Sequence, residues 1–197
     1  GGWPTNRFEA LALGDFDGDG DLDAVGAVGG GGVPAGVRLA ANDGTGRFTE
    51  LPISLPQAAT QAAGWVDADG DGQLDLWLLQ SIAVGNPTNT LLVLRQESGR
   101  FVESFRVPGE VVGKFTNEPV WADFDNDGGL DFAGPYAQML TFATTNLVTI
   151  YHGRGQGTFS TKGVPVALDF YQLIGPAVDY NNDGTADLLT RPGGSLW

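Results

Sequence analysis

The sequence contains no cysteine, and only one histidine and one methionine among its 197 residues. The absence of cysteine excludes disulfide scaffolds, zinc–thiolate sites and cysteine nucleophiles. Lysine and arginine are also scarce, at 10 residues against 24 aspartates and glutamates, and the formal net charge is −14. Nucleic acids and anionic membrane surfaces require clustered Lys and Arg, so we expect neither as a partner. The chain also lacks an apolar run long enough to cross a bilayer, so no membrane span is expected.

Charged residues make up only 17% of the chain, below the roughly 25% typical of soluble domains, whereas glycine is abundant. The 31 glycines are more than twice the usual share of about 7%. Hydrophobic residues stand at an ordinary 42%. We therefore expect many tight turns around one apolar core rather than disorder, and the length suits a single region over residues 1–197.

An acidic phrase recurs four times along the chain. It reads DFDGDGDLD from Asp15, DADGDGQLD from Asp67, DFDNDGGLD from Asp123 and DYNNDGTAD from Asp179. The copies are spaced by 52, 56 and 56 residues. Each phrase is numbered below from position 1, its first Asp, to position 9, its last. A regular period of this length is the signature of a repeat architecture.

A second, glycine-rich phrase follows each of the first three copies at a nearly constant distance. NDGTGRF ends at Phe48, QESGRF at Phe101 and GRGQGTF at Phe159. Short apolar runs lie between the two kinds of phrase, and their Gly, Asn and Asp boundaries are typical of strands. The runs cover residues 11–13, 75–79, 91–94, 101–105, 120–122, 147–151 and 187–189. Each repeat is therefore predicted to be strand, acidic loop, strand, connector, strand, hairpin, strand.

A four-stranded unit of this period predicts an all-β fold, specifically a β-propeller. The expected blades cover approximately residues 8–57, 58–115 and 116–171, with a half blade over 172–197. A β-sandwich of independent hairpins is the alternative. An isolated sheet cannot cover both of its faces, so blades must stack on their neighbours. Trp65 and Trp121, each two residues before a first Asp, suit that packing.

About three and a half blades cannot close a ring. We therefore expect either that the chain is part of a longer one or that copies assemble. Two copies would supply seven blades, so a homodimer that completes a propeller is one expectation.

The acidic phrases predict Ca²⁺ sites, about four in number and one in each loop. Alternate residues of a tight loop aim their side chains at one point, glycine at position 6 permits the turn, and position 7 offers its backbone carbonyl. Ca²⁺ takes 6–8 such hard oxygen ligands. The predicted ligands are Asp15, Asp17, Asp19, Asp21 and Asp23 in the first loop, Asp67, Asp69, Asp71, Gln73 and Asp75 in the second, Asp123, Asp125, Asp127, Gly129 and Asp131 in the third, and Asp179, Asn181, Asp183, Thr185 and Asp187 in the fourth.

Other metal sites fit the phrases less well. Mg²⁺ wants fewer protein ligands, no imidazole or thiolate is expected near the loops to favour zinc, and an EF-hand needs an acid at position 12. The four loops hold 16 of the 24 acids, so four Ca²⁺ ions would bring the net charge to −6. We expect each ion to tie the first strand of a blade to its second. The fourth site is expected to be the weakest because Asn181 replaces a carboxylate there.

The strings DFDGDGDLD and DADGDGQLD, with the turn NDGTGRF, resemble the FG-GAP/VCBS repeat family, whose best-known members are integrin alpha-chain propellers. The resemblance implies a β-propeller, usually of seven blades, with Ca²⁺ between the first and second strands. It also implies an extracellular or cell-surface protein with a role in adhesion or ligand binding. Some fungal lectins of the family recognise N-acetylglucosamine between blades. The resemblance assigns no sugar-binding residues in this sequence.

No catalytic function is expected from these residues. His152, the single histidine, lies at a predicted hairpin where we expect an exposed side chain, and the loop carboxylates are accounted for by metal ligation. The predicted function is a calcium-stabilised extracellular recognition module that binds glycans or a surface protein. The alternatives are a structural or assembly unit of a larger surface protein, filament or secreted enzyme, and an enzyme such as a polysaccharide lyase. Open, carboxylate-rich sites fill at the millimolar Ca²⁺ that extracellular modules use, which places the protein outside the cell.

Overall fold

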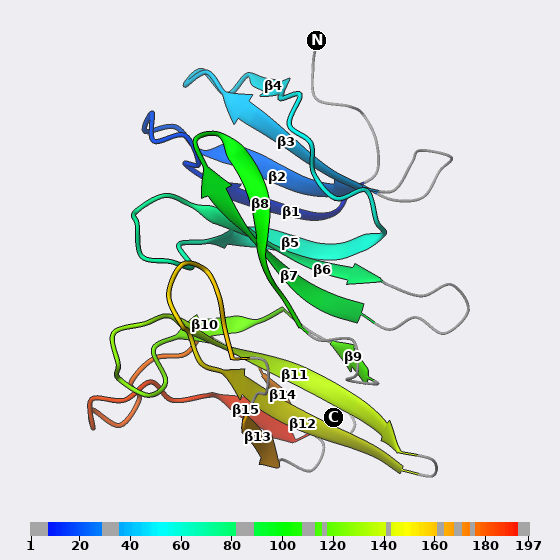
Figure 1. Ribbon diagram of the computed structural model, residues 1–197, viewed down its shortest axis with the longest axis vertical. Coiled ribbons are helices and arrows are strands. Elements are labelled where there is room, and N and C mark those ends of the chain that lie inside the picture. Colours follow the sequence, from blue (N-terminus) through cyan, green and yellow to red (C-terminus); the bar gives the residue numbers. More distant parts are fainter. Residues whose placement is uncertain are drawn as a thin grey trace.

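The computed structural model describes residues 8–28, 36–81, 89–107, 113–115, 118–140, 143–160, 164–167, 171–173 and 176–192. None of these residues lies in a helix, and the strands form antiparallel sheets (Figure 1). The all-β prediction is therefore confirmed. Within the same described ranges, no helix is long and apolar enough to span a membrane.

The first two sheets are four-stranded meanders, in which each strand pairs with the next one along the chain. The first sheet consists of β1 (Phe8–Gly14), β2 (Asp23–Val28), β3 (Gly36–Asn42) and β4 (Phe48–Glu50). The second consists of β5 (Thr60–Val66), β6 (Asp75–Ser81), β7 (Asn89–Glu97) and β8 (Arg100–Arg106). In both sheets an acidic phrase connects the first strand to the second, and a glycine-rich phrase connects the third to the fourth, as predicted.

The third sheet has the same order with one addition. It consists of β10 (Val120–Ala122), β11 (Asp131–Leu140), β12 (Ala143–Tyr151) and β13 (Val164–Ala167), and β9 (Gly113–Phe115) also pairs with β11. The predicted second blade, 58–115, contains β9, whose hydrogen bonds thus belong to the third sheet. Around the fourth acidic phrase, β14 (Tyr171–Leu173) pairs with β15 (Thr190–Pro192).

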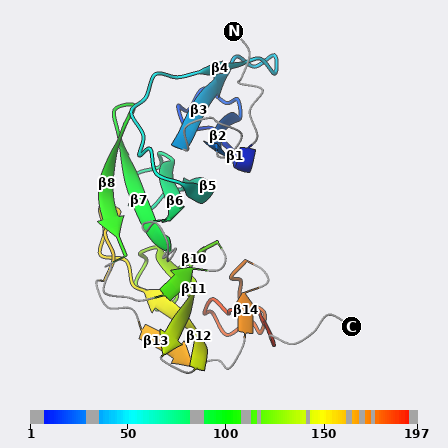
Figure 2. The same ribbon diagram turned by 90° about the vertical axis from the view of Figure 1, so that its right-hand side faces the viewer.

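The three large sheets stack face to face in chain order (Figure 1). Seen from the side, they follow an arc, with β1, β5, β10 and β14 toward its concave side and β8 and β13 toward its convex side (Figure 2). Along the inside of the arc, β1 and β2 of the first sheet contact β5 of the second. The layers of the core lie between the sheets.

Trp65 joins the first sheet to the second. Its indole stacks on Phe16, with ring centroids 5.8 Å apart and planes 7° from parallel. A Cβ on Gly14 would lie 2.6 Å from the indole Cδ1, so only glycine lets β1 approach the ring this closely. Val25, Leu39 and other buried apolar side chains of both sheets complete this layer. The expected role of Trp65 in packing between units is confirmed.

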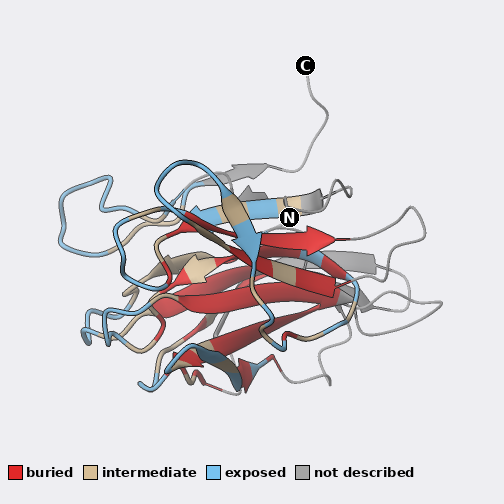
Figure 3. Ribbon diagram, turned by 90° about the horizontal axis from the view of Figure 1, so that it is seen from above, coloured by how far each residue is buried: buried red, intermediate tan, exposed pale blue. Residues whose placement is uncertain are grey.

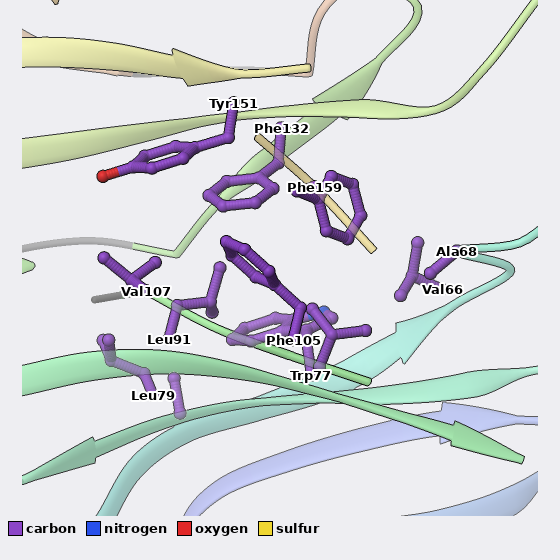
Figure 4. Close-up of a cluster of buried hydrophobic side chains, with 12 residues drawn as sticks. Val66, Ala68, Trp77, Leu79, Leu91, Phe105, Val107, Phe132, Tyr151 and Phe159 are labelled. Atoms are coloured by element: carbon purple, nitrogen blue, oxygen red, sulfur yellow. The ribbon is translucent and has the colours of Figure 1, made fainter. Parts of the chain in front are cut away.

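An aromatic cluster joins the second sheet to the third (Figure 4). Phe132 lies at its centre, stacked on Tyr151 at 4.7 Å and edge-on to Phe159 at 5.0 Å. Phe105 of β8 reaches up to this group from the second sheet, 6.1 Å from Phe132 between ring centroids. Trp121 contacts Phe132 and Phe159, as its place before the third acidic loop predicts.

The second sheet is buried on both faces because it lies between the other two. This accounts for the unbroken apolar runs in β6 and β7, where no alternation of polar residues appears. Figure 3 shows the strands mainly as buried, and exposed residues gather in the loops along one edge.

The outer faces at the two ends of the stack expose apolar side chains. On the first sheet, Leu13 and Leu22 are 53% and 54% exposed. They occupy the repeat positions of Trp65 and Leu74, which pack against the preceding sheet. Tyr180 in the fourth loop is 51% exposed and occupies the repeat position of Phe16. The two ends thus present the two kinds of face that meet inside the stack.

Candidate metal-binding site

The four acidic phrases form loops on the same side of the molecule, at the left in Figure 1. Three of them connect the first and second strands of the large sheets, and the fourth lies between β14 and β15. This common placement follows from the meander, because each loop leaves its sheet at the same end of the equivalent strand.

Backbone conformation explains why glycine or asparagine stands at two positions of each loop. Position 6 is glycine in all four copies and has a positive φ of 86° to 94°, as at Gly20 and Gly72. Position 4 also has a positive φ, at Gly18, Gly70, Asn126 and Asn182. Glycine and asparagine are the residues that adopt this left-handed region most readily. The sequence prediction explained position 6 and gave no role to position 4.

The carboxylate at position 1 holds each loop in shape. Asp15 accepts hydrogen bonds from the backbone N–H groups of Gly18 at 2.8 Å and Gly20 at 3.0 Å. Asp67 accepts the equivalent pair from Gly70 and Gly72. Asp123 and Asp179 likewise accept two each, from positions 5 and 6 of their loops. The loop therefore turns around this side chain.

Positions 1, 3 and 5 bring three carboxylates together in each of the first three loops. In each trio, one oxygen from every residue lies within 4.8 Å of the others. Two oxygens bound to one Ca²⁺ at 2.3–2.6 Å lie at most about 5 Å apart, so these spacings fit a shared Ca²⁺. The trios are Asp15, Asp17 and Asp19; Asp67, Asp69 and Asp71; and Asp123, Asp125 and Asp127.

The fourth loop differs at position 3. The side-chain N–H of Asn181 donates to Asp183 Oδ2 at 3.0 Å, and its Oδ1 accepts from the Asp183 backbone at 2.8 Å. An amide thus stands where the other loops have a third carboxylate. That the fourth loop attracts a cation least remains a prediction.

The carboxylate at position 9 is buried and joins two parts of its repeat. Asp23 and Asp75 are at most 1% exposed. Asp23 accepts a hydrogen bond from Phe16 N at position 2 and another from Asn42 N at the end of β3. Asp75 does the same with Ala68 N and Gln96 N of β7.

Asp131 repeats this arrangement in the third loop, with Phe124 N at 2.9 Å and Gly153 N at 2.7 Å. In the fourth loop, Asp187 accepts from Tyr180 N at 3.0 Å. Position 9 was predicted to help tie the first strand to the second through an ion. Its carboxylate also reaches the third strand directly.

Burial makes the ionised form of Asp23 and Asp75 costly. It raises the pKa of Asp75 to about 6 and also raises the pKa of Asp23. The negative charges of the carboxylates at positions 3 and 5 also raise these two pKa values, whereas the two backbone N–H donors lower them. A cation beside positions 3 and 5 would relieve part of this cost, which is a second reason that the loops suit Ca²⁺.

Position 7 was predicted to supply a backbone carbonyl. Its N–H donates to the position 5 carboxylate in every loop, for example from Gln73 to Asp71 at 2.8 Å. That bond fixes the peptide plane on its N-terminal side. The carbonyl ligands of Asp21, Gln73, Gly129 and Thr185 remain predictions.

His152 lies at the predicted hairpin but closer to a loop than the sequence prediction expected. Its Nδ1 lies 2.9 Å from Asp125 Oδ2 and 3.3 Å from Asp131 Oδ2, although no imidazole was expected near the loops. It directly precedes Gly153, which donates to position 9. Arg95 holds the equivalent place before Gln96, and its guanidinium lies 3.8 Å from Asp69 Oδ2. His152 and Arg95 could be identified as neighbours of the loops only once the register of the third strand was known.

Residues 15–78 match the family model for an FG-GAP-like repeat. The matched segment runs from the first acidic loop through the second and into β6. The resemblance predicted from the acidic phrases is therefore confirmed for this part of the chain. FG-GAP repeats generally bind Ca²⁺ and are typical of extracellular proteins. A comparison with curated proteins found no match.

Replacing Asp75 by asparagine is expected to destabilise the metal-free protein by about 1–3 kcal/mol. The amide nitrogen cannot accept one of the two backbone N–H bonds, so one buried donor loses its partner. Asp71→Asn is the matched control, since Asp71 is exposed and keeps an oxygen for Gln73 N, and its effect should stay within about 0.5 kcal/mol. Urea unfolding in excess chelator measures both. Equal losses would contradict the bridging role of Asp75.

Replacing Asn181 by aspartate should raise the Ca²⁺ affinity of the fourth loop by roughly tenfold, because the number of ligand charges tunes such sites. Calorimetric titration of the weakest binding phase measures this. Asn182→Asp is the control, because it adds the same charge at position 4, where no ligand is predicted. The prediction fails if both variants strengthen binding equally, or if the wild-type protein shows four equal sites.

Proposed function

We propose that the chain is part of a calcium-stabilised extracellular β-propeller that recognises glycans or a surface protein. The observation that carries this proposal is the convergence of three carboxylates in each of the first three loops, two of which lie within the FG-GAP-like match. Meander sheets stacked along an arc support the propeller. We propose binding rather than catalysis because metal ligation accounts for the loop carboxylates.

In this proposal the ions are structural. In the first three loops the carboxylates at positions 1, 3 and 5 would hold the ion, together with the predicted carbonyl of position 7. Bound Ca²⁺ would offset the repulsion among carboxylates that converge within a few ångströms. Because position 9 connects the same loop to the third strand, an ordered loop also holds the third strand and the hairpin that follows it.

In this proposal a hydroxyl-rich ligand contacts a depression between the second and third sheets. Its volume is about 160 Å³, and β7, β8 and the hairpin after β12 form its walls. Its lining residues are Arg95, Glu97, Val102, Glu103, Ser104, Gln156 and Thr158. Ser104 Oγ donates to Gly157 O at 2.8 Å, which links β8 to the hairpin after β12. Charged and hydroxyl side chains of this kind recognise sugars by hydrogen bonds.

Arg95 connects this depression to the second metal loop. Its guanidinium pairs with Glu97 in the depression and lies 3.8 Å from Asp69 in the loop. Loss of the ion from that loop would free Asp69 to draw Arg95 away from the depression. Ligand binding should therefore depend on Ca²⁺.

Glycan-array binding in millimolar Ca²⁺, repeated after chelation, tests this function. We expect specific binding that chelation abolishes, together with a fall in melting temperature. Arg95→Met should remove glycan binding while the protein stays folded, whereas Arg38→Met, on β3 and paired with Glu50, should not. An unchanged melt in chelator would contradict the structural role of Ca²⁺. If folded, Ca²⁺-loaded protein bound nothing on glycan and surface-protein screens, the recognition function would be contradicted.

The exposed apolar ends of the stack favour a second candidate function, an assembly unit. The face that carries Leu13 and Leu22 has the repeat positions that elsewhere pack on a preceding sheet. The face with Tyr180 has the positions that pack on a following one. We propose that these faces meet between two copies of the chain.

Sedimentation equilibrium distinguishes the assembly candidate. We expect a concentration-dependent dimer that Leu13→Asp reduces to monomer, because a buried charge in that face would be unpaired. Val102→Asp, on exposed β8 away from both ends, is the control and should leave the dimer intact. A monomer at all concentrations would contradict assembly.

A further inference from the structure

We propose that the third acidic loop is a mixed histidine–carboxylate site for a divalent transition-metal ion of the Zn²⁺ type. The ligands are His152 Nδ1, Asp125 and Asp131. This inference deepens the proposed function, since it rests on the acidic loops being metal sites, and it assigns one of them a different metal preference.

The spacing of the three groups fits one small ion. His152 Nδ1 lies 2.9 Å from Asp125 Oδ2 and 3.3 Å from Asp131 Oδ2. With metal–ligand bonds of about 2.1 Å, neighbouring ligands of one ion lie about 3.0–3.4 Å apart in octahedral or tetrahedral geometry. The three ligand atoms all fall within 4.8 Å of one another.

Backbone contacts on both sides of His152 hold the imidazole at the loop. His152 N donates to Ser160 Oγ at 3.1 Å, and its carbonyl accepts from Ser160 N at 2.8 Å. Gly153 N donates to Asp131 Oδ1 at 2.7 Å. A Cβ on Gly153 would lie 2.5 Å from Leu130 O, so glycine allows this segment to press against the loop. The ring is therefore positioned before any ion binds.

The equivalent place in the other large sheets carries no such ligand. Ala41 precedes Asn42 in the first sheet and has no metal-binding atom. Arg95 precedes Gln96 in the second sheet, and its guanidinium is a fixed cation that cannot ligate. Among the three sheets whose third strand is described, the third alone offers its loop a nitrogen that can ligate a metal ion.

The donor type sets the metal preference. Imidazole nitrogen suits Zn²⁺, Co²⁺ and related ions, whereas Ca²⁺ takes oxygen ligands. Asp125 belongs to both the carboxylate trio of the loop and the group with His152. The loop can therefore use Asp125 for a hard ion held by oxygens alone or for a transition-metal ion held with His152. The first two loops can hold an ion only through oxygen ligands.

The test measures binding of Zn²⁺ and Co²⁺ to the whole chain in buffer that contains millimolar Ca²⁺. We expect one Zn²⁺ site by calorimetry, weakened at least about tenfold by His152→Ala. Ala41→His should create a second such site at the first loop. His152 is the only histidine, so its imidazole resonances can be followed without ambiguity, and Co²⁺ should shift them paramagnetically.

The outcomes separate this inference from the proposed function. Unchanged Zn²⁺ affinity in His152→Ala, or imidazole resonances that ignore Co²⁺, would overturn the mixed site and show that His152 serves only as an ion-pair partner. The rise in melting temperature with Ca²⁺ should persist in His152→Ala, because the first two loops do not use this residue. Histidine-dependent Zn²⁺ binding without any response to Ca²⁺ would support the mixed site while contradicting the calcium-stabilised module.

Discussion

The buried aspartate at position 9 of the first three acidic loops is the contact on which the rest of the structure depends. Asp23 and Asp75 each accept one backbone N–H from their own loop and one from the third strand. Asp131 accepts one from its loop and one from Gly153, just after the third strand. One side chain thus fixes three strands relative to one another before any metal is considered. In the first two loops burial raises the pKa of this carboxylate, at Asp23 and Asp75, so these loops gain from a cation nearby. Structure and metal binding are in this way parts of one arrangement.

Face-to-face stacking of the sheets joins the repeated units into one structure. Each sheet has a face that meets the preceding sheet and a face that meets the following one, and large aromatics such as Trp65 and Phe132 fill the layers between. Because every sheet repeats the same meander, all acidic loops lie on one side (Figure 1). The hairpins before the fourth strands contact the neighbouring unit, as Ser104 and Gly157 show. Differences between repeats therefore produce local differences in surface chemistry on a common scaffold.

Much of this arrangement could be predicted from the sequence, because the repeats specify it locally. The acidic and glycine-rich phrases marked both kinds of turn, and six of the seven predicted apolar runs are strands in the structure. The prediction was wrong for residues 187–189, where only an isolated bridge joins Asp187 to Val178. The contacts that were missed join residues far apart in the chain. His152 lies 29 residues after Asp123, Arg95 lies 28 after Asp67, and Ala41 lies 26 after Asp15, so variable connectors hide their equivalence. The pairing of β9 with β11 was missed for the same reason, since no pattern in three residues identifies a partner strand.

Amide hydrogen exchange, with and without Ca²⁺, tests most directly whether the position 9 carboxylates and the ions act together. The informative amides are the six donors to position 9 in the first three loops: Phe16, Asn42, Ala68, Gln96, Phe124 and Gly153. The account predicts that all six are protected in chelator, where the carboxylates alone hold them, and that Ca²⁺ slows their exchange further. Exchange as fast as that of exposed hairpin amides, or protection that Ca²⁺ leaves unchanged, would contradict it.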